Sequence, residues 1–332
     1  MLAPVAWRVP PRHYGPWELV VSQLTEALVA RGVDVTLFAS ADSLTSARLV
    51  AVCERPYEED PEVDAKVAEC MHIATIMEHS GEFDLVHNHF DFLPLTYARL
   101  IDTPIVTTIH GFSSERIVRV YRRYDDHVAY VAISDADRHP DLSYAATVHH
   151  GIPVELSAEG PGSADGTLVF FGRIHPDKGT AEAIEVARRS GRPLVLAGIV
   201  QDQTYFDEQV APHIDGDRVR YVGPVGPAER DQLLGHCDAL LHLVNFAEPF
   251  GLSMIEAMAC GTPVIATPRG AVPEVVADGR TGFIVDGVDD AVAAVDRLDR
   301  LDRAACRGHI EDNFSIGRMV DGYLAVYRSI LD

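Results

Sequence analysis

The stretch that says most about the fold is residues 245–263, which read NFAEPFGLSMIEAMACGTP. A Pro-Phe-Gly turn follows Glu248 and opens an expected helix that carries Glu256. β-branched and apolar runs at 238–244 and 262–266 flank this helix and predict strands. Strand, turn, helix and strand in this order are typical of a parallel sheet covered by helices.

The same alternation extends along the rest of the chain. Further strands are predicted at 33–39, 83–87, 104–109, 128–133, 167–171, 193–197 and 218–222. Apolar residues at helical spacing predict helices over 17–28, 62–79 and 315–331, with Gly32 as the glycine that ends the first of them. The pattern indicates an α/β protein with doubly wound sheets, in which ligands bind at the carboxyl ends of the strands.

A chain of 332 residues suits two domains of ordinary size. The segment 157–166 is small, polar and rich in glycine, as an interdomain linker should be. We therefore expect one Rossmann-like domain over 1–158 and a second over 166–313, followed by a C-terminal helix over 314–332.

Composition excludes several classes of protein. The formal net charge of −22 argues against a nucleic-acid partner, because such a partner needs clustered basic residues. No apolar run is long enough to span a membrane, and no signal peptide is visible. The five cysteines show no CxxC pair and predict reduced core thiols. A cytoplasmic protein without an integral membrane segment is the expectation.

The two carboxylates of the opening stretch suit a polar ligand. The start of a helix offers free backbone N–H groups, and a nearby carboxylate accepts hydrogen bonds from paired hydroxyls. Alternatively, Glu248 and Glu256 are solvated surface charges, although the apolar residues around them leave few positions that face solvent.

With these residues the stretch resembles the retaining glycosyltransferases of family 4, which have the GT-B fold. The resemblance implies two Rossmann-like domains that face each other across a cleft, with a C-terminal helix that crosses back to the first. It implies that Glu248 contacts the donor sugar and Glu256 the ribose diol. The amides of Phe250, Gly251 and Leu252 are then expected to meet the donor sugar or its phosphate.

A second motif, Gly-Arg173-x4-Lys178-Gly, follows the predicted strand 167–171. Two cations at the carboxyl end of a strand are well placed to neutralise a diphosphate. The family pattern matches here as well, which assigns Arg173 and Lys178 to the pyrophosphate. A solvated pair on a loop is the alternative, but Lys178 is one of only two lysines in the chain.

The expected first domain contributes weaker candidates. His110 ends the strand 104–109, and the resemblance places it near the terminal hydroxyl of the donor sugar. His87 and His89 lie where another predicted strand ends; they suit contact with an acceptor better than a metal, since no third ligand is evident. Gly15 stands where relatives have Gly-Gly and is a donor-binding candidate, although the following Pro16 has no N–H to offer.

The sequence therefore predicts a metal-independent retaining glycosyltransferase that moves a sugar from a nucleotide-diphosphate sugar to an acceptor hydroxyl. The catalytic candidates are His110, Arg173, Lys178 and Glu248. We expect no cofactor beyond the co-substrate. The main alternative is a nucleotide-sugar-binding protein without transferase activity. A dinucleotide-dependent oxidoreductase would need a GxGxxG motif that residues 8–18 lack, and a phosphorylase would need a pyridoxal-phosphate lysine and a longer chain.

Overall fold

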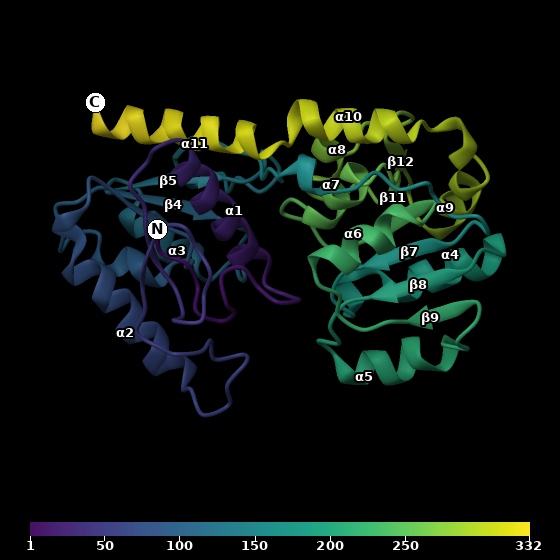
Figure 1. Ribbon diagram of the computed structural model, residues 1–332, viewed down its shortest axis with the longest axis horizontal. Coiled ribbons are helices and arrows are strands. Elements are labelled where there is room, and N and C mark those ends of the chain that lie inside the picture. Colours follow the sequence, from purple (N-terminus) through teal and green to yellow (C-terminus); the bar gives the residue numbers. More distant parts are fainter. The chain divides into compact units, whose positions relative to one another are not determined.

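The computed structural model describes residues 1–332 and divides them into two compact units (Figure 1). Unit 1 consists of Met1–Gly151 together with Ile316–Asp332, and unit 2 is Ile152–Ser315. Each unit has its own parallel sheet and its own apolar core.

The strands of unit 1 run parallel in the orders β1-β2 and β3-β4-β5-β6. Their bounds are β1 Thr36–Phe38, β2 Arg48–Val50, β3 Val86–Asn88, β4 Ile105–Ile109, β5 Val128–Ala132 and β6 Tyr144–Thr147. The chain start joins the two groups, because Leu2 bridges to both Phe38 and Asn88.

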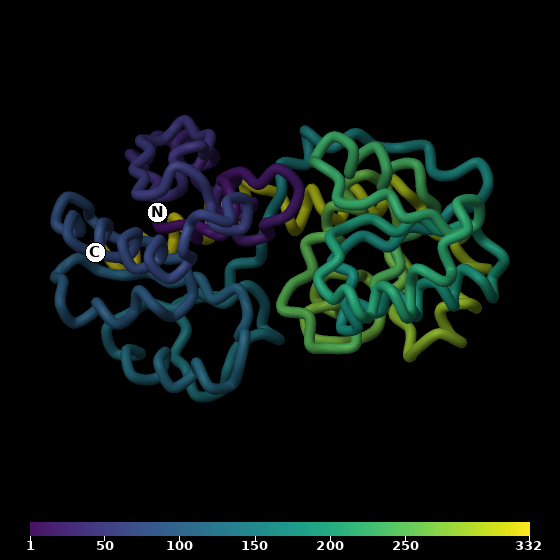
Figure 2. Tube along the Cα trace, turned by 90° about the horizontal axis from the view of Figure 1, so that it is seen from below, coloured from purple at the N-terminus to yellow at the C-terminus, as the bar shows by residue number.

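Four α-helices belong to unit 1. They are α1 Pro16–Ala30, α2 Ala65–Glu78, α3 Val118–Tyr124 and the C-terminal α11 Ile316–Leu331. Gly32 has a positive φ of 81° just beyond α1, which confirms the expected end of that helix. The helix α11 packs on α1 and buries Met319, Tyr323 and Tyr327. In Figure 2 its yellow end accordingly lies among the purple and blue segments of unit 1.

Unit 2 holds one six-stranded parallel sheet in the order β12-β11-β10-β7-β8-β9. The bounds are β7 Leu168–Phe171, β8 Leu194–Ala197, β9 Val219–Tyr221, β10 Ala239–His242, β11 Val264–Ala266 and β12 Gly282–Ile284. Counted within the unit, this is the 3-2-1-4-5-6 order of a doubly wound nucleotide-binding sheet. The strand order reverses between β7 and β10, which are neighbours in the sheet.

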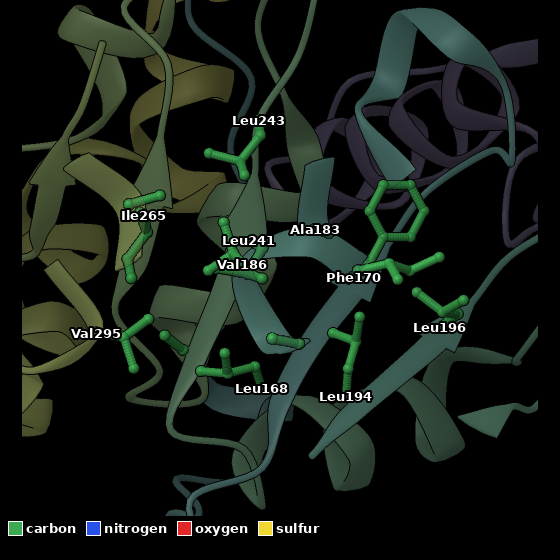
Figure 3. Packing of buried hydrophobic residues seen from close by; sticks show 14 of the residues in the cluster. Leu168, Phe170, Ala183, Val186, Leu194, Leu196, Leu241, Leu243, Ile265 and Val295 are labelled. Atoms are coloured by element: carbon green, nitrogen blue, oxygen red, sulfur yellow. The ribbon is translucent and has the colours of Figure 1, made fainter. Parts of the chain in front are cut away.

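The helices of unit 2 connect the strands and cover the sheet. They are α4 Thr180–Ser190, α5 Gln203–Tyr205, α6 Pro227–Gly235, α7 Leu252–Ala259, α8 Val272–Val275, α9 Val288–Val295 and α10 Arg303–Asn313. Leu168, Phe170, Leu194 and Leu241 of the strands pack against Val186 of α4 and the neighbouring side chains of one core (Figure 3). This buried sheet fixes the strand ends from which the candidate residues project.

The boundary between the units differs from the expectation of 1–158 and 166–313. The structure places it at Gly151 and Ile152. Residues 157–166 are not a free linker, because their backbone forms hydrogen bonds with other segments of unit 2. The Gly160 amide donates to the Cys260 carbonyl, and the Gly162 amide donates to the Gly235 carbonyl. At the other end, unit 2 extends to Ser315, two residues past the expected 313. The composition of a loop does not reveal such backbone contacts.

Candidate functional site

The loops after β7 and β10 bring a cation and a carboxylate together at the point where the strand order reverses. Lys178 Nζ lies 2.6 Å from Glu248 Oε2, although the two residues are 70 positions apart. Their side chains are 17% and 8% exposed. The sequence placed both residues at strand ends, and the sheet order makes them partners.

A glycine holds the Lys178 loop in place. The segment Pro176–Lys178 forms a single 3-10 turn, and Gly179 after it adopts a left-handed conformation with φ of 75°. A Cβ on Gly179 would lie 1.9 Å from the Leu243 carbonyl oxygen. Only glycine combines this φ with so close an approach to the neighbouring strand. The Gly after Lys178 in the motif is therefore a packing requirement.

Two further side chains surround the pair. Lys178 Nζ lies 4.6 Å from the centre of the Phe246 ring, within cation–π range. His242, the last residue of β10, places Nε2 3.4 Å from Glu248 Oε2, a contact at ion-pair distance. Burial alone would raise the pKa of Glu248, but His242 and the Lys178 ammonium together lower it to about 2. Glu248 is therefore an ionised carboxylate at neutral pH.

Glu248 leads directly into the start of α7. Gly251 caps this helix in a left-handed conformation with φ of 87°, and Leu252 is its first residue. The Glu248 carbonyl accepts a hydrogen bond of 2.8 Å from the Ala271 amide, which fixes the loop. A helix start of this kind presents unpaired N–H groups and the positive end of the helix dipole, both suited to an anion.

Glu256 lies on α7 and contacts a different cation. Its Oε1 accepts a 2.5 Å hydrogen bond from Arg230 of α6. Burial raises the pKa of Glu256, and the Arg230 charge opposes that shift. Glu256 is thus buried and paired, so the interpretation of a solvated surface charge is excluded.

Arg173 is the candidate that the structure leaves apart from this pair. Its guanidinium donates to the side-chain carbonyl of Gln201, in the loop after β8. Arg173 and Lys178 both follow β7, but they have different partners. The expectation that both meet one diphosphate stays a prediction.

His110 of unit 1 ends a buried chain of hydrogen bonds. His110 Nε2 lies 2.9 Å from His89 Nδ1, and His89 Nε2 lies 3.3 Å from His87 Nδ1. Tyr327 of α11 closes the chain with its hydroxyl 2.6 Å from His87 Nδ1. Burial, first among the causes, holds the pKa of all three imidazoles well below the usual value, so they are neutral. His87 and His89 therefore have partners inside unit 1.

At the His110 end of this row of hydrogen bonds, one ring nitrogen has no partner. His110 Nδ1 is buried and has no hydrogen-bond partner in the chain. The ring stacks on Trp17, with centroids 5.4 Å apart. An unsatisfied buried nitrogen at a strand end is suited to a ligand hydroxyl.

Gly15 caps α1 with a positive φ of 144° in a crowded place. A Cβ there would lie 3.0 Å from Glu18 Oε2 and 3.1 Å from Trp7 Cβ. Pro16 takes the first position of the helix, as the sequence suggests. The need for glycine is thus explained by packing, and contact with a donor stays a prediction.

The comparisons with known proteins identify the family. Residues 156–303 match the family described as glycosyl transferases group 1, and residues 18–140 match glycosyltransferase family 4. Together the two matches fall on both units. The chain belongs to the family 4 glycosyltransferases.

Individual relatives are distant but span nearly the whole chain. This glycosyltransferase is 27% identical to the D-inositol 3-phosphate glycosyltransferase of Mycolicibacterium smegmatis over 94% of its own length and 86% of the relative's. Sucrose-phosphate synthase of Thermosynechococcus elongatus superposes with a TM-score of 0.82 at 19% identity, covering 99% and 98% of the two chains. Anabaena HepE in complex with UDP and glucose gives 0.75 at 19%, covering 95% and 96%. The fold is therefore GT-B.

Sequence reasoning missed several residues of this glycosyltransferase. His242 and Phe246 contact the Lys178–Glu248 pair, and Arg230 contacts Glu256. A polar residue at the end of a buried strand was the available signal for His242. Arg230 lies in a helix with no recognisable motif, so only the structure reveals it. None of the helices is both long and apolar enough to cross a membrane.

Proposed function

We propose that this glycosyltransferase transfers a sugar from a nucleotide-diphosphate sugar to an acceptor hydroxyl, with retention of the anomeric configuration and without a metal ion. The observation that carries the proposal is the buried Lys178–Glu248 pair, which lies at the reversal of the strand order and leads into the start of α7. Doubly wound sheets bind nucleotides at this place.

Each candidate has a role that follows from its charge. Lys178 and Arg173 neutralise the diphosphate as its bond to the anomeric carbon breaks, and the amides of Phe250, Gly251 and Leu252 contact the same ligand. Glu248, ionised and acceptor-only, accepts hydrogen bonds from the sugar hydroxyls. His110 offers Nδ1 to a further hydroxyl of the donor.

Lys178 has two partners once the donor binds. It is paired with Glu248, so its ammonium must be shared between this carboxylate and the diphosphate. Sharing is possible because an ammonium has three N–H donors. Glu248 keeps the contact with His242 during this exchange.

Two relatives suggest the first ligands to test. UDP and glucose are bound in the structure of Anabaena HepE, which makes UDP-glucose the first donor to try. The inositol phosphate in the name of the M. smegmatis relative makes a phosphorylated polyol the first acceptor class. The five cysteines are all free thiols, and we propose a reducing cytoplasm as the place of action.

The direct test screens UDP-, GDP-, ADP- and TDP-sugars by thermal shift and follows the best binder with candidate acceptors by mass spectrometry. NMR of the product then gives the anomeric configuration, and excess chelator tests the need for a metal. A product of inverted configuration would contradict retention. Loss of turnover on chelation would contradict metal independence.

Substitution of Lys178 separates an enzyme from a mere binding protein. A cation that meets developing charge lowers the barrier more than it strengthens ground-state binding, and loss of such a donor costs about 2.7–4 kcal/mol in the barrier. We expect Lys178→Ala to lower kcat more than it raises the donor KM, and Arg173→Ala to do the same.

The control is Lys66→Ala, which removes the other lysine of the chain, an exposed residue of α2. It should leave both constants unchanged. If Lys178→Ala and Arg173→Ala raise KM alone, these residues only hold the donor. If the wild-type chain binds a nucleotide sugar without turning it over in the presence of any acceptor, the alternative of a non-catalytic binding protein is correct.

A further inference from the structure

An arginine that no motif marks lies against the carboxylate assigned to the ribose. Arg230 is the fourth residue of α6, Pro227–Gly235, and its guanidinium donates to Glu256 Oε1 at 2.5 Å. The two side chains are 13% and 5% exposed. An ion pair shielded from water to this degree interacts far more strongly than one on the surface.

The guanidinium is held from behind by its neighbour in the sequence. Arg230 Nε donates to Asp231 Oδ1 at 2.8 Å, and its second amino group lies 2.7 Å from the same oxygen. With one edge of its planar fork occupied in this way, Arg230 presents the remaining amino group to Glu256. The direction of the Glu256 contact is therefore fixed by α6.

Other charged groups on the elements around α7 have their own partners. From α10, Arg303 donates to main-chain carbonyls that include that of Cys260, and Arg307 donates to the carbonyl of Ala259. From β10, His242 faces Glu248. The strand β11 consists of Val264, Ile265 and Ala266 and has no titratable group. The remaining charge near Glu256 is Asp231, which disfavours a second negative charge.

We propose that Arg230 is a positioning residue for the nucleotide site: it holds the Glu256 carboxylate in one orientation and opposes its protonation, with the carboxylate lone pairs that Arg230 does not use directed to the ribose diol. The inference rests on the proposed function, since it takes Glu256 as the ribose ligand. Arg230 itself does not contact the nucleotide in this arrangement.

The physical reason is the cost of a buried charge without a partner. A carboxylate surrounded by protein takes up a proton unless a cation opposes the effect of burial. Protonated Glu256 would lose one acceptor oxygen, and with it part of its capacity to bind two hydroxyls. Removing Arg230 should therefore weaken nucleotide binding through Glu256, in a way that depends on pH.

The test measures the affinity of the full-length chain for free UDP, or for whichever of UDP, GDP, ADP and TDP binds best, by calorimetry from about pH 6 to about pH 9. Arg230→Met removes the charge and keeps the aliphatic volume. Arg230→Lys keeps the charge, and Glu256→Gln removes the group on which Arg230 acts. The affinities of wild type and Glu256→Gln also show how much of the pH dependence comes from titration of the nucleoside diphosphate itself.

We expect Arg230→Met to bind weakly at low pH and to gain affinity relative to wild type as pH rises, by about tenfold per pH unit while Glu256 is still protonated. Arg230→Lys should recover most of the affinity at neutral pH. The double variant Arg230→Met/Glu256→Gln should bind as Glu256→Gln alone does, with no added pH dependence.

A second readout is independent of the ligand. In Arg230→Met the folded-state pKa of Glu256 lies further above its unfolded value, so the free energy of unfolding should decrease as pH rises through that range. The double variant should lack this decrease. The measurement also shows whether each variant is folded.

The outcomes separate the inference from the proposed function. Unchanged affinity in Glu256→Gln contradicts the ribose assignment itself. A loss in Glu256→Gln together with a pH-independent loss in Arg230→Met overturns the role of the charge. If the double variant binds more weakly than Glu256→Gln, Arg230 contacts the nucleotide directly, and the positioning role is wrong.

Discussion

The carboxyl groups of three buried glutamates differ in pKa because their neighbours differ. Glu248 contacts Lys178 and His242, and its pKa is lowered to about 2. Glu256 contacts Arg230 but is buried deeply enough that its pKa is raised. Glu18 has only backbone N–H donors as partners, and burial raises its pKa to about 7. The same side chain is thus a fixed anion in one place and a titrating group in another.

Glu248→Gln tests contact with the sugar. Glutamine keeps the shape but loses the charge and one acceptor oxygen. We expect affinity for the free nucleoside diphosphate to stay near wild type while turnover of the intact donor falls. The quantity to measure is the ratio of donor affinity to diphosphate affinity.

The matched control for Glu248→Gln is Asp177→Asn. Asp177 is an exposed carboxylate next to Lys178 in the chain. Its substitution by asparagine removes one negative charge from the loop that carries Lys178. It should leave the ratio unchanged. Equal losses for both ligands in Glu248→Gln would show that this carboxylate does not distinguish the sugar.

Glu18→Gln tests the buried carboxyl of unit 1. The folded pKa of about 7 lies above the usual 4.5, so the protonated form stabilises the fold. That contribution is complete below 4.5 and is lost as pH rises through about 7, at a cost of about 3 kcal/mol. Glutamine does not titrate and can still accept the Trp7 amide. Urea unfolding at about pH 5 and about pH 8 should show a smaller loss in the variant than in wild type; equal losses would contradict the burial effect.

At the scale of single elements, short turns determine where the functional side chains lie. Most predicted strands and helices are present within a few residues, because apolar periodicity reports burial directly. The turns that follow them are less predictable. The left-handed Gly179 is an example, because the Leu243 carbonyl that excludes a side chain there belongs to the residue directly after another strand, β10.

Gly179→Ala and Gly191→Ala form a matched pair. Both glycines are left-handed and flank α4, but a Cβ on Gly191 meets nothing within 4 Å. The conformation itself costs about 1–2 kcal/mol in each. Gly179→Ala should cost a further 1–3 kcal/mol or so, because it also displaces the loop that carries Lys178.

Denaturant titration measures this difference, and donor binding provides a second readout. Gly179→Ala should also bind the nucleoside diphosphate more weakly, whereas Gly191→Ala should bind as wild type does. Equal destabilisation by the two substitutions would mean that the close approach to β10 has no energetic consequence.

At the scale of the whole molecule, the chain builds one continuous unit and one discontinuous unit. Unit 2 is the single segment Ile152–Ser315, whereas unit 1 needs α11 from the far end of the chain. Tyr323 and Tyr327 of α11 bond Thr108 and His87 of the unit 1 sheet. Unit 1 is therefore incomplete until the last helix has been made.

Truncation after Ser315 tests this dependence. The missing helix buries five side chains in unit 1, each worth roughly 1.5–3 kcal/mol. The truncated chain should lose the unfolding transition of unit 1 in calorimetry and keep that of unit 2, together with binding of the nucleoside diphosphate. Loss of diphosphate binding would show that unit 2 does not hold the nucleotide site by itself.

The sequence by itself determined the fold class, the positions of most elements and the donor-site candidates, because periodicity and the two motifs lie within short segments. It did not determine the boundary at Gly151, the pairing of Lys178 with Glu248, or the roles of His242 and Arg230. These features depend on the order of strands in the sheet and on contacts between helices distant in the chain. Local patterns do not encode such contacts, because the neighbours are set only when the apolar faces of the elements pack together.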